Sequence, residues 1–124
     1  MQRAVNDIPS WARGALWTAP AGVEARPLAE LARDAGLVLL RVEGTGRYLG
    51  PDVHDACDEL GLLLWQDLML ARFDYPFDEA CFVAELEGEV AALVDGLAGR
   101  PSVVVLCGSS EVAQQAAMWG RPPV

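Results

Sequence analysis

Residues 103–111 read "VVVLCGSSE", and this stretch sets the pattern of the whole chain. Apolar residues, mostly β-branched, run without interruption into Cys107 and Gly108, and the carboxylate of Glu111 follows shortly after. A short, continuous apolar run is typical of a strand that is buried on both faces of a parallel sheet. We therefore expect a strand over 102–108 that carries Glu111 at its carboxyl end.

Outward from this strand, apolar and amphipathic segments alternate along the chain. The expected strands cover 10–17, 37–43, 62–67 and 102–108, and the expected helices cover 27–36, 50–61, 78–99 and 111–120. Glycines at 36, 61 and 99 mark helix ends. The helix over 78–99 carries an expected core stripe of Phe82, Leu86, Val90, Leu93 and Leu97.

This alternation predicts an α/β fold with a parallel sheet covered by helices. Two architectures fit, an open doubly wound sheet and a partial TIM (β/α)₈ barrel of about four βα units. A whole barrel needs about 250 residues, and this chain has 124. In a half-barrel the inner-facing positions, among them Val38, Leu40, Leu63 and Val104, would lack cover.

Composition excludes several classes of partner. The net charge is −9 and lysine is absent, which argues against nucleic acid and anionic membrane surfaces. No apolar run reaches the roughly 18 residues of a membrane span, and the N-terminus has no signal-peptide pattern. The three cysteines, Cys57, Cys81 and Cys107, lie in apolar segments and predict reduced, buried thiols. We expect a cytoplasmic protein.

Polar and aromatic residues gather where the expected strands end. In parallel α/β folds these carboxyl ends share one rim, where ligands bind. Aromatic faces beside bidentate hydrogen-bonding groups suit a neutral, polyhydroxylated ligand such as a sugar. The residues at these ends are Trp17, Arg41, Glu43, Trp65, Gln66, Asp67, Ser109, Ser110 and Glu111.

Two phrases carry a family resemblance. "DACDELGLLLWQDLMLARFDYP" (55–76), followed by "RPSVVVLCGSSE" (100–111), resembles the catalytic barrel of glycoside hydrolase family two, in particular its β-mannosidase branch. "NDIPSWARGALWTAP" (6–20) and "LARDAGLVLLRVEGTGRY" (31–48) are similar to the upstream strands of that barrel. The resemblance implies that residues 1–124 form the N-terminal half of a glycosidase barrel that hydrolyses terminal β-mannosides or related β-glycosides with retention, without cofactor or metal.

The resemblance also assigns roles to residues. It makes Glu111 the general acid/base, and it places the other matching residues in or around the sugar site: Trp17, Arg41, Trp65, Gln66, Asp67 and Ser110. Four departures stand out: Ser110 replaces an asparagine that contacts the sugar 2-hydroxyl, Glu43 replaces an aromatic residue, Leu16 replaces an asparagine, and "GTG" replaces a glycine triplet.

The family's nucleophile has no counterpart in this chain. Retaining glycosidases need a second carboxylate about 5–5.5 Å from the acid/base. The resemblance implies that it lies on the seventh barrel strand, whereas this chain ends at Val124 after the fourth strand. We therefore expect the chain alone to be inactive, and the same residues to act within a longer chain.

Three alternatives remain open. The chain could be a non-catalytic half-barrel that self-associates or binds a completing half-barrel segment, because two sheet edges would be unpaired. It could be a nucleotide-binding domain that uses the Gly44–Thr45–Gly46 loop and Asp67. Metal binding is the weakest, because the single histidine, His54, is expected to be a partly exposed helix residue and no zinc-ligand spacing is present.

Overall fold

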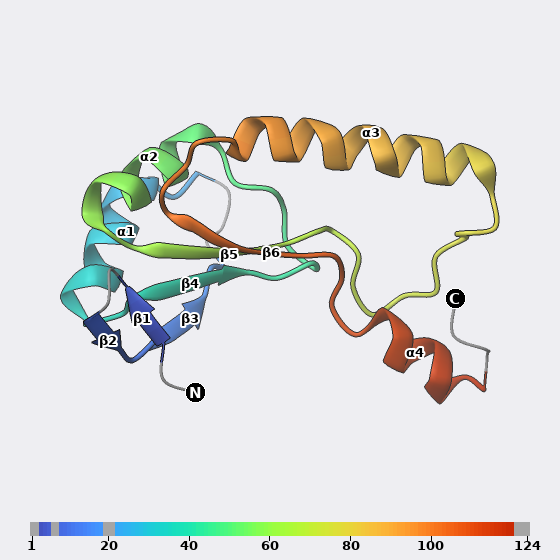
Figure 1. The fold of residues 1–124 in the computed structure, drawn as a ribbon, viewed down its shortest axis with the longest axis horizontal. Helices are drawn as coiled ribbons and strands as arrows, with labels where there is room; N and C mark the ends of the chain where they lie inside the picture. Colours follow the sequence, from blue (N-terminus) through green and yellow to red (C-terminus); the bar gives the residue numbers. More distant parts are fainter. Residues whose placement is uncertain (1–2, 6–7, 19–21, 121–124) are drawn as a thin grey trace.

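The computed structural model describes residues 3–5, 8–18 and 22–120, and it places four parallel strands in one sheet. Figure 1 shows these strands side by side in chain order: β3 (Gly14–Leu16), β4 (Leu39–Val42), β5 (Leu63–Asp67) and β6 (Val103–Cys107). The helices that alternate with them are α1 (Ala25–Asp34), α2 (Pro51–Leu60), α3 (Ala80–Leu97) and α4 (Val112–Met118). Sequential strand order is that of a barrel rather than a doubly wound sheet, so the predicted partial barrel is confirmed.

The first predicted strand is much shorter than expected. Of residues 10–17, only Gly14–Leu16 pair with β4, and Ser10 instead ends a separate antiparallel hairpin. This hairpin joins β1 (Arg3–Val5) to β2 (Ile8–Ser10) and was not predicted. Strands of three residues are too short for alternation to be read from the sequence.

Helices α1 and α2 cover one face of the sheet. Ala29 of α1 and Cys57 of α2 are fully buried against Leu40 and Leu64 of the neighbouring strands. Leu40 therefore faces the helices, and its assignment to the inner face was wrong. Side chains alternate along a strand, so Leu39 and Arg41 lie on the opposite, open face, where they line a hollow with Trp65.

Glycines end the helices as predicted. Gly36 and Gly61 have φ angles of 74° and 71°, a left-handed conformation that residues with a side chain adopt at a cost. At Gly61 the chain reverses so that the backbone N–H of Leu62 donates to the carbonyl of Cys57. The turn therefore leads from α2 directly into β5.

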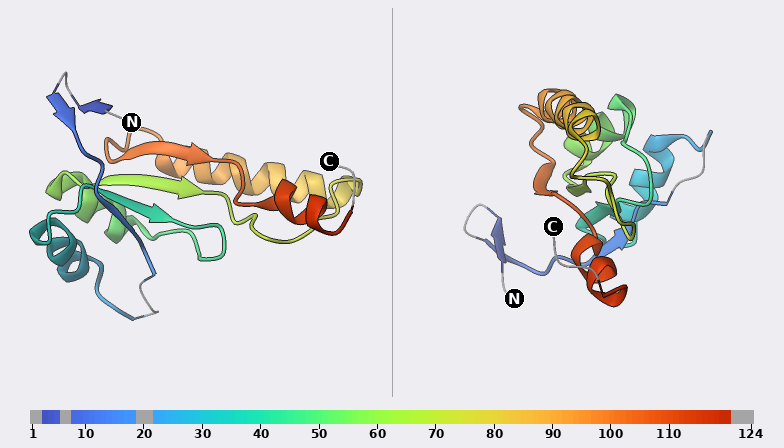
Figure 2. Two further views of the ribbon diagram at one scale, coloured as in Figure 1. Left: turned by 90° about the horizontal axis from the view of Figure 1, so that it is seen from below. Right: turned by 90° about the vertical axis from the view of Figure 1, so that its right-hand side faces the viewer.

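Helix α3 departs most from the expected packing. Figures 1 and 2 show it running well past the carboxyl ends of the strands, and it has no buried residue. Its predicted core stripe of Phe82, Leu86, Val90, Leu93 and Leu97 is only half-buried. At its first turn Phe82 packs against Tyr75 and Phe77, with ring centroids 6.0 and 5.7 Å away. The stripe is a helix face that the described residues cover only in part.

A polar contact between α2 and the start of β6 fixes the fourth strand. The carboxylate of Asp58 accepts hydrogen bonds from the backbone N–H of Ser102 and from Arg100, at 2.9 and 3.1 Å. Burial opposes ionisation, but these hydrogen bonds from Ser102 and Arg100 prevail and lower the pKa of Asp58. The contact therefore anchors the amino end of the strand that leads to Glu111.

Burial corrects two predictions about single residues. His54 is 6% exposed rather than partly exposed, and burial lowers its pKa. Of the cysteines only Cys57 is buried, which raises its pKa to about 11, whereas Cys81 is exposed and Cys107 half-buried. In the part of the chain that the structure describes, no group of acidic, histidine and cysteine residues could hold a metal ion, and no helix is long and apolar enough to cross a membrane.

Gly44 allows the segment after β5 to lie directly against the end of β4. A Cβ atom at Gly44 would sit 2.6 Å from the carbonyl oxygen of Leu68 and 3.1 Å from that of Leu70. Both obstacles are backbone atoms, which cannot turn away as the end of a side chain could. The first glycine of the "GTG" stretch therefore has a packing role that positions the chain leading to Ala71 and Arg72.

We expect Gly44→Ala to lower the free energy of unfolding by about 1–3 kcal/mol, as overpacking usually does. Gly96→Ala is the matched control, because a Cβ there meets no atom within 4 Å and alanine is favoured over glycine inside a helix by about 1 kcal/mol. Urea denaturation of both variants measures the difference. Equal or reversed midpoints would contradict the close approach at Gly44.

Candidate active site at the carboxyl ends of the strands

A fully buried carboxylate organises the rim. Asp67, the last residue of β5, accepts hydrogen bonds from Nη2 and Nε of Arg41 at 2.7 and 3.2 Å and from the indole Nε1 of Trp65 at 2.7 Å. The Arg41 guanidinium also lies 4.9 Å from the Trp65 ring centroid. Since Arg41 and Trp65 are register partners, this cluster joins the ends of two neighbouring strands.

The contact with Asp67 further stabilises the charged form of Arg41. The hydrogen bonds to Asp67 raise its pKa above the ordinary value, and they outweigh the opposing effect of partial burial. A bidentate guanidinium–carboxylate pair of this kind also fixes the plane of both groups. The cluster therefore fixes the side-chain orientations of Arg41 and Asp67 at the carboxyl ends of β4 and β5.

The segment after β5 returns beside the end of β6. Ala71 forms a single parallel bridge with Ser110, the Ser110 N–H donates to the Leu70 carbonyl at 2.8 Å, and the Arg72 N–H donates to the Ser110 carbonyl at 3.1 Å. The Ser110 hydroxyl lies 3.5 Å from Nη2 of Arg41. The residue next to Glu111 is thereby tied both to β4 and to the chain that leaves β5.

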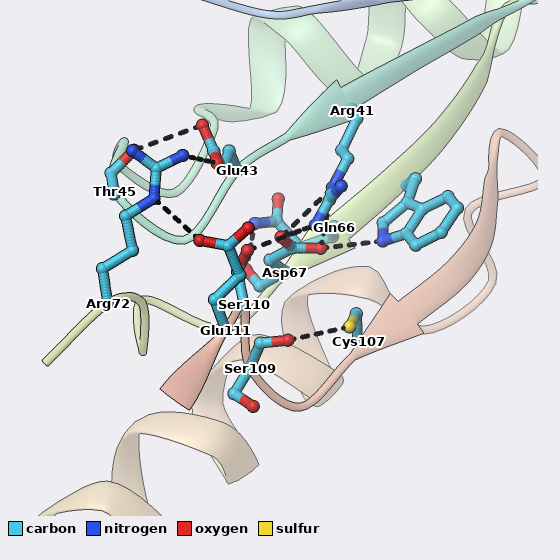
Figure 3. A network of polar contacts seen from close by, with 11 residues as sticks. Arg41, Glu43, Thr45, Gln66, Asp67, Arg72, Cys107, Ser109, Ser110 and Glu111 are labelled. Atoms are coloured by element: carbon cyan, nitrogen blue, oxygen red, sulfur yellow. Dashed lines mark hydrogen bonds and ion pairs between the residues drawn. The ribbon is translucent and has the colours of Figure 1, made fainter. Parts of the chain in front are cut away.

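Three charged residues form a chain on this rim (Figure 3). Arg72 donates from Nη2 to Glu43 at 2.6 Å, and its Nε lies 3.5 Å from Oε2 of Glu111. Glu43 follows β4, Arg72 follows β5 and Glu111 follows β6, so each comes from the end of a different strand. The side chain of Glu111 is 55% exposed, so its carboxylate is accessible from solvent.

Trp17 and Gln66 stand apart from this cluster. The Trp17 N–H donates to the carbonyl of Arg41 at 2.8 Å, so Trp17 lies at the same end of the sheet. Its side chain, however, packs against the helix-side core and borders a hollow of about 410 Å³ that is also lined by Glu43 and Arg47. Gln66 is buried, and its amide donates to the backbone carbonyl of Asp67. The structure thus brings together Arg41, Trp65, Asp67, Ser110 and Glu111.

The Gly44–Thr45–Gly46 loop has a structural explanation without a ligand. The backbone N–H of Gly46 donates to the carbonyl of Glu43 at 2.8 Å and closes a tight turn. Thr45 donates its hydroxyl proton to the Glu43 carboxylate at 3.4 Å. Asp67, the expected ribose-binding acid, is already bonded to Arg41 and Trp65. These contacts explain the loop without a bound nucleotide, and nucleotide binding stays a prediction.

Sequence reasoning missed Arg72, which belongs to an irregular segment without periodicity. One signal was available: Glu43 places a charge where the resembling family has an aromatic residue. A buried or half-buried carboxylate needs a cationic partner. A glutamate at position 43 therefore predicts that an arginine side chain lies close to it. The sequence could not say that Arg72 is that arginine, because the two lie 29 positions apart.

Comparison with known proteins relates this chain to one enzyme family. The chain is 32% identical over 114 residues to the goat (Capra hircus) protein named beta-mannosidase, a match that covers 86% of this chain and 13% of the goat protein. It is 36% identical over 81 residues to beta-mannosidase B of Thermothelomyces thermophilus, which covers 65% of this chain and 9% of that protein.

A solved structure gives the same answer. The crystal structure of the β-D-mannosidase of Dictyoglomus thermophilum superposes with a TM-score of 0.72 at 34% sequence identity, and the match covers 84% of this chain and 14% of that chain. No protein-family model matches the sequence. The chain thus spans about an eighth of the length of the curated animal relatives that it matches.

We expect Arg41→Met to destabilise the chain by about 3 kcal/mol, because it leaves the buried Asp67 carboxylate without its ionic partner. Arg33→Met is the control, since Arg33 pairs with Asp34 on the exposed surface of α1 and such pairs contribute about 1 kcal/mol or less. Urea unfolding followed by tryptophan fluorescence and circular dichroism gives both values. Similar losses in the two variants would refute the organising role of the Arg41–Asp67 pair.

Proposed function

This chain is a β-mannosidase-like segment of glycoside hydrolase family two, and on that premise we propose that it supplies the acid/base side of a retaining glycosidase site. The observation that carries the proposal is the position of Glu111. Its carboxylate is exposed at the carboxyl end of β6, on the rim that also holds the Arg41–Asp67–Trp65 cluster. Active sites of barrel enzymes are built on this rim.

In the proposed reaction Glu111 acts twice. Protonated, it donates its proton to the glycosidic oxygen as the bond to the leaving group breaks and a glycosyl–enzyme ester forms. As the carboxylate, it then takes a proton from the water that cleaves this ester, which restores its protonated form. The exposure of Glu111 to solvent is compatible with both steps.

The nucleophile is proposed to come from residues beyond this segment. Asp67 lies on the same rim, but it is fully buried and both of its oxygens accept hydrogen bonds from Arg41 or Trp65. Glu43 is paired with Arg72. Asp67 is enclosed too completely to reach an anomeric carbon, so we assign it to shaping the site, and we assign Glu43 to holding Arg72.

The substrate class we propose is a terminal β-mannoside or a related β-glycoside. Arg41, Trp65 and Asp67 present a planar, hydrogen-bonding surface suited to sugar hydroxyls. Ser110 has one hydroxyl where the resembling family has an amide, so it can make fewer simultaneous contacts to a 2-hydroxyl. We infer that recognition at this hydroxyl is weaker than in proteins with asparagine.

We propose that further barrel strands, from a chain as long as the relatives, cover the open side of the sheet. Apolar residues of the two outer strands are exposed: Leu16 of β3 is 51% exposed, and Val104 and Leu106 of β6 are 50% and 47% exposed. Because Leu106 is the register partner of Gln66, it lies on the face toward the helices, so the exposed surface at β6 is not confined to the open side. An apolar hollow of about 410 Å³ also lies between β3 and α1. Unpaired strand edges with apolar side chains invite association.

For activity, we expect no measurable turnover of an aryl β-mannoside by the 124-residue chain, because a proton donor alone accelerates a reaction by only about 10²–10⁴-fold. A hybrid in which this chain replaces the matching segment of the Dictyoglomus thermophilum β-mannosidase should be active. In that hybrid, Glu111→Gln should lower kcat/KM on a phenyl β-mannoside by about 10²–10⁴-fold.

The control for this assay is Glu87→Gln, which removes a carboxylate from the exposed surface of α3. It should leave the rate unchanged. A hybrid whose rate is insensitive to Glu111→Gln would contradict the assignment of Glu111 as acid/base. Turnover by the short chain that depends on Glu111 would show that the short chain contains a nucleophile.

For association, we expect the short chain to form oligomers or to bind an apolar-surface dye, whereas the hybrid should not bind the dye. Burying a large aliphatic side chain contributes roughly 1.5–3 kcal/mol. Association that buries the exposed side chains of Leu16, Val104 and Leu106 is therefore favourable. Light scattering with dye fluorescence tests this. A monodisperse, dye-silent monomer of the short chain would contradict the proposed open face.

A further inference from the structure

Two residues with side chains adopt a left-handed backbone in the described part of the chain, and they face each other. Arg72 and Glu111 both have φ of 61°. This conformation is uncommon for residues other than glycine, asparagine and aspartate, and it persists where surrounding contacts enforce it. The two positions lie in different connections, one after β5 and one after β6, so no local sequence effect couples them.

Backbone hydrogen bonds hold both strained positions in place. Ser110, which precedes Glu111, donates to Leu70 and accepts from the N–H of Arg72. Immediately after Glu111 the chain enters α4, and the Glu111 carbonyl accepts from Gln115 at 3.0 Å. The direction in which each side chain leaves the backbone is therefore set by the fold.

The Arg72 side chain spans the gap between two carboxylates of unequal exposure. Glu43 is the more buried partner, with 22% of its side chain exposed, whereas Glu111 is 55% exposed. Glu43 is also bonded to Thr45 within the turn after β4. Arg72 thus contacts one largely buried carboxylate, Glu43, and one exposed carboxylate, Glu111, as Figure 3 shows.

We propose that Arg72 is a positioning residue that holds the carboxylate of Glu111 in one orientation on the rim, with Glu43 as its anchor. The proposal deepens the function proposed above and rests on it for the catalytic consequence. Its physical basis is entropic: a glutamate on an exposed rim samples several rotamers, and a guanidinium fixed at its other end selects one of them. Orientation matters because proton transfer requires hydrogen-bond distance and alignment.

The direct test measures the orientation of Glu111 in the 124-residue chain. Three-bond NMR couplings should report a single Glu111 χ1 rotamer in the unmodified chain and averaged rotamers in Arg72→Met. Arg26→Met is the matched control, since Arg26 is a similarly exposed arginine that bridges two carboxylates, Glu30 and Glu59, on the helix layer. In Arg26→Met the couplings of Glu111 should still report a single χ1 rotamer.

A second variant keeps the test decisive if Arg72→Met loses its folded spectrum. Glu43→Gln leaves Arg72 in place but removes the ionic anchor, so it should give partial averaging of Glu111. Arg72→Lys retains a charge without the planar fork and should restore part of the order. An unchanged single rotamer in the folded variants, or averaging already present in the unmodified chain, overturns the proposal.

The catalytic readout uses leaving groups in the hybrid enzyme. Proton donation matters for a phenyl leaving group and little for 2,4-dinitrophenyl, which departs without help. Arg72→Met should therefore lower kcat/KM about tenfold on the phenyl β-mannoside and less than about twofold on the dinitrophenyl one. Equal losses on both substrates would mean a merely structural role and overturn the proposal.

The two tests also separate the proposals. If Glu111→Gln has no effect in the hybrid, the acid/base function fails, while the NMR couplings still decide whether Arg72 orients Glu111. If Glu111→Gln is damaging on the phenyl substrate but Arg72→Met is not, the function stands and the positioning role falls.

Discussion

The rim depends on the burial of one negative charge. Asp67 is completely enclosed, and an enclosed carboxylate is tolerated only with a close partner of opposite charge and with its oxygens hydrogen-bonded. Arg41 and Trp65 meet that requirement, and in doing so they fix the ends of β4 and β5 relative to each other. Ser110 contacts the same arginine, which brings the end of β6, and with it Glu111, into the same unit.

The departures from the resembling family are linked in space rather than scattered. Glu43, in place of an aromatic residue, pairs with Arg72, and Arg72 reaches Glu111. Ser110 contacts Arg41 through its hydroxyl and Arg72 through its backbone carbonyl. Next to the proposed acid/base the rim therefore carries a network of charged residues, at a place where the resemblance implies an aromatic residue.

Much of the fold was predictable because the local signals agree with the tertiary structure. Continuous apolar runs gave β4, β5 and β6 within two residues of their observed ends, and glycines at 36 and 61 marked the helix ends. The prediction failed where packing partners decide the outcome: Leu40 faces the helices, and the stripe on α3 is half-exposed. Period-2 alternation does not say which face of a strand meets the helices unless one face is polar.

The site was predictable only as far as parallel strands bring their carboxyl ends together. Arg41, Trp65, Asp67, Ser110 and Glu111 meet for that reason, whereas Trp17 and Gln66, at equivalent places in the sequence, turn into the packed layer. Arg72 lies in an irregular connection whose path follows from the close approach at Gly44 and the bridge to Ser110. Neither contact has a periodic signature.

If this rim presents Glu111 to a glycosidic oxygen, the contact should be visible in a crystal structure of the hybrid enzyme that carries Glu111→Gln and holds an intact phenyl β-mannoside. We expect a side-chain atom of residue 111 within about 2.6–3.2 Å of the glycosidic oxygen, next to the Arg41–Asp67–Trp65 cluster. A glycosidic oxygen in contact with a different acidic residue, with residue 111 turned away from the substrate, would contradict it.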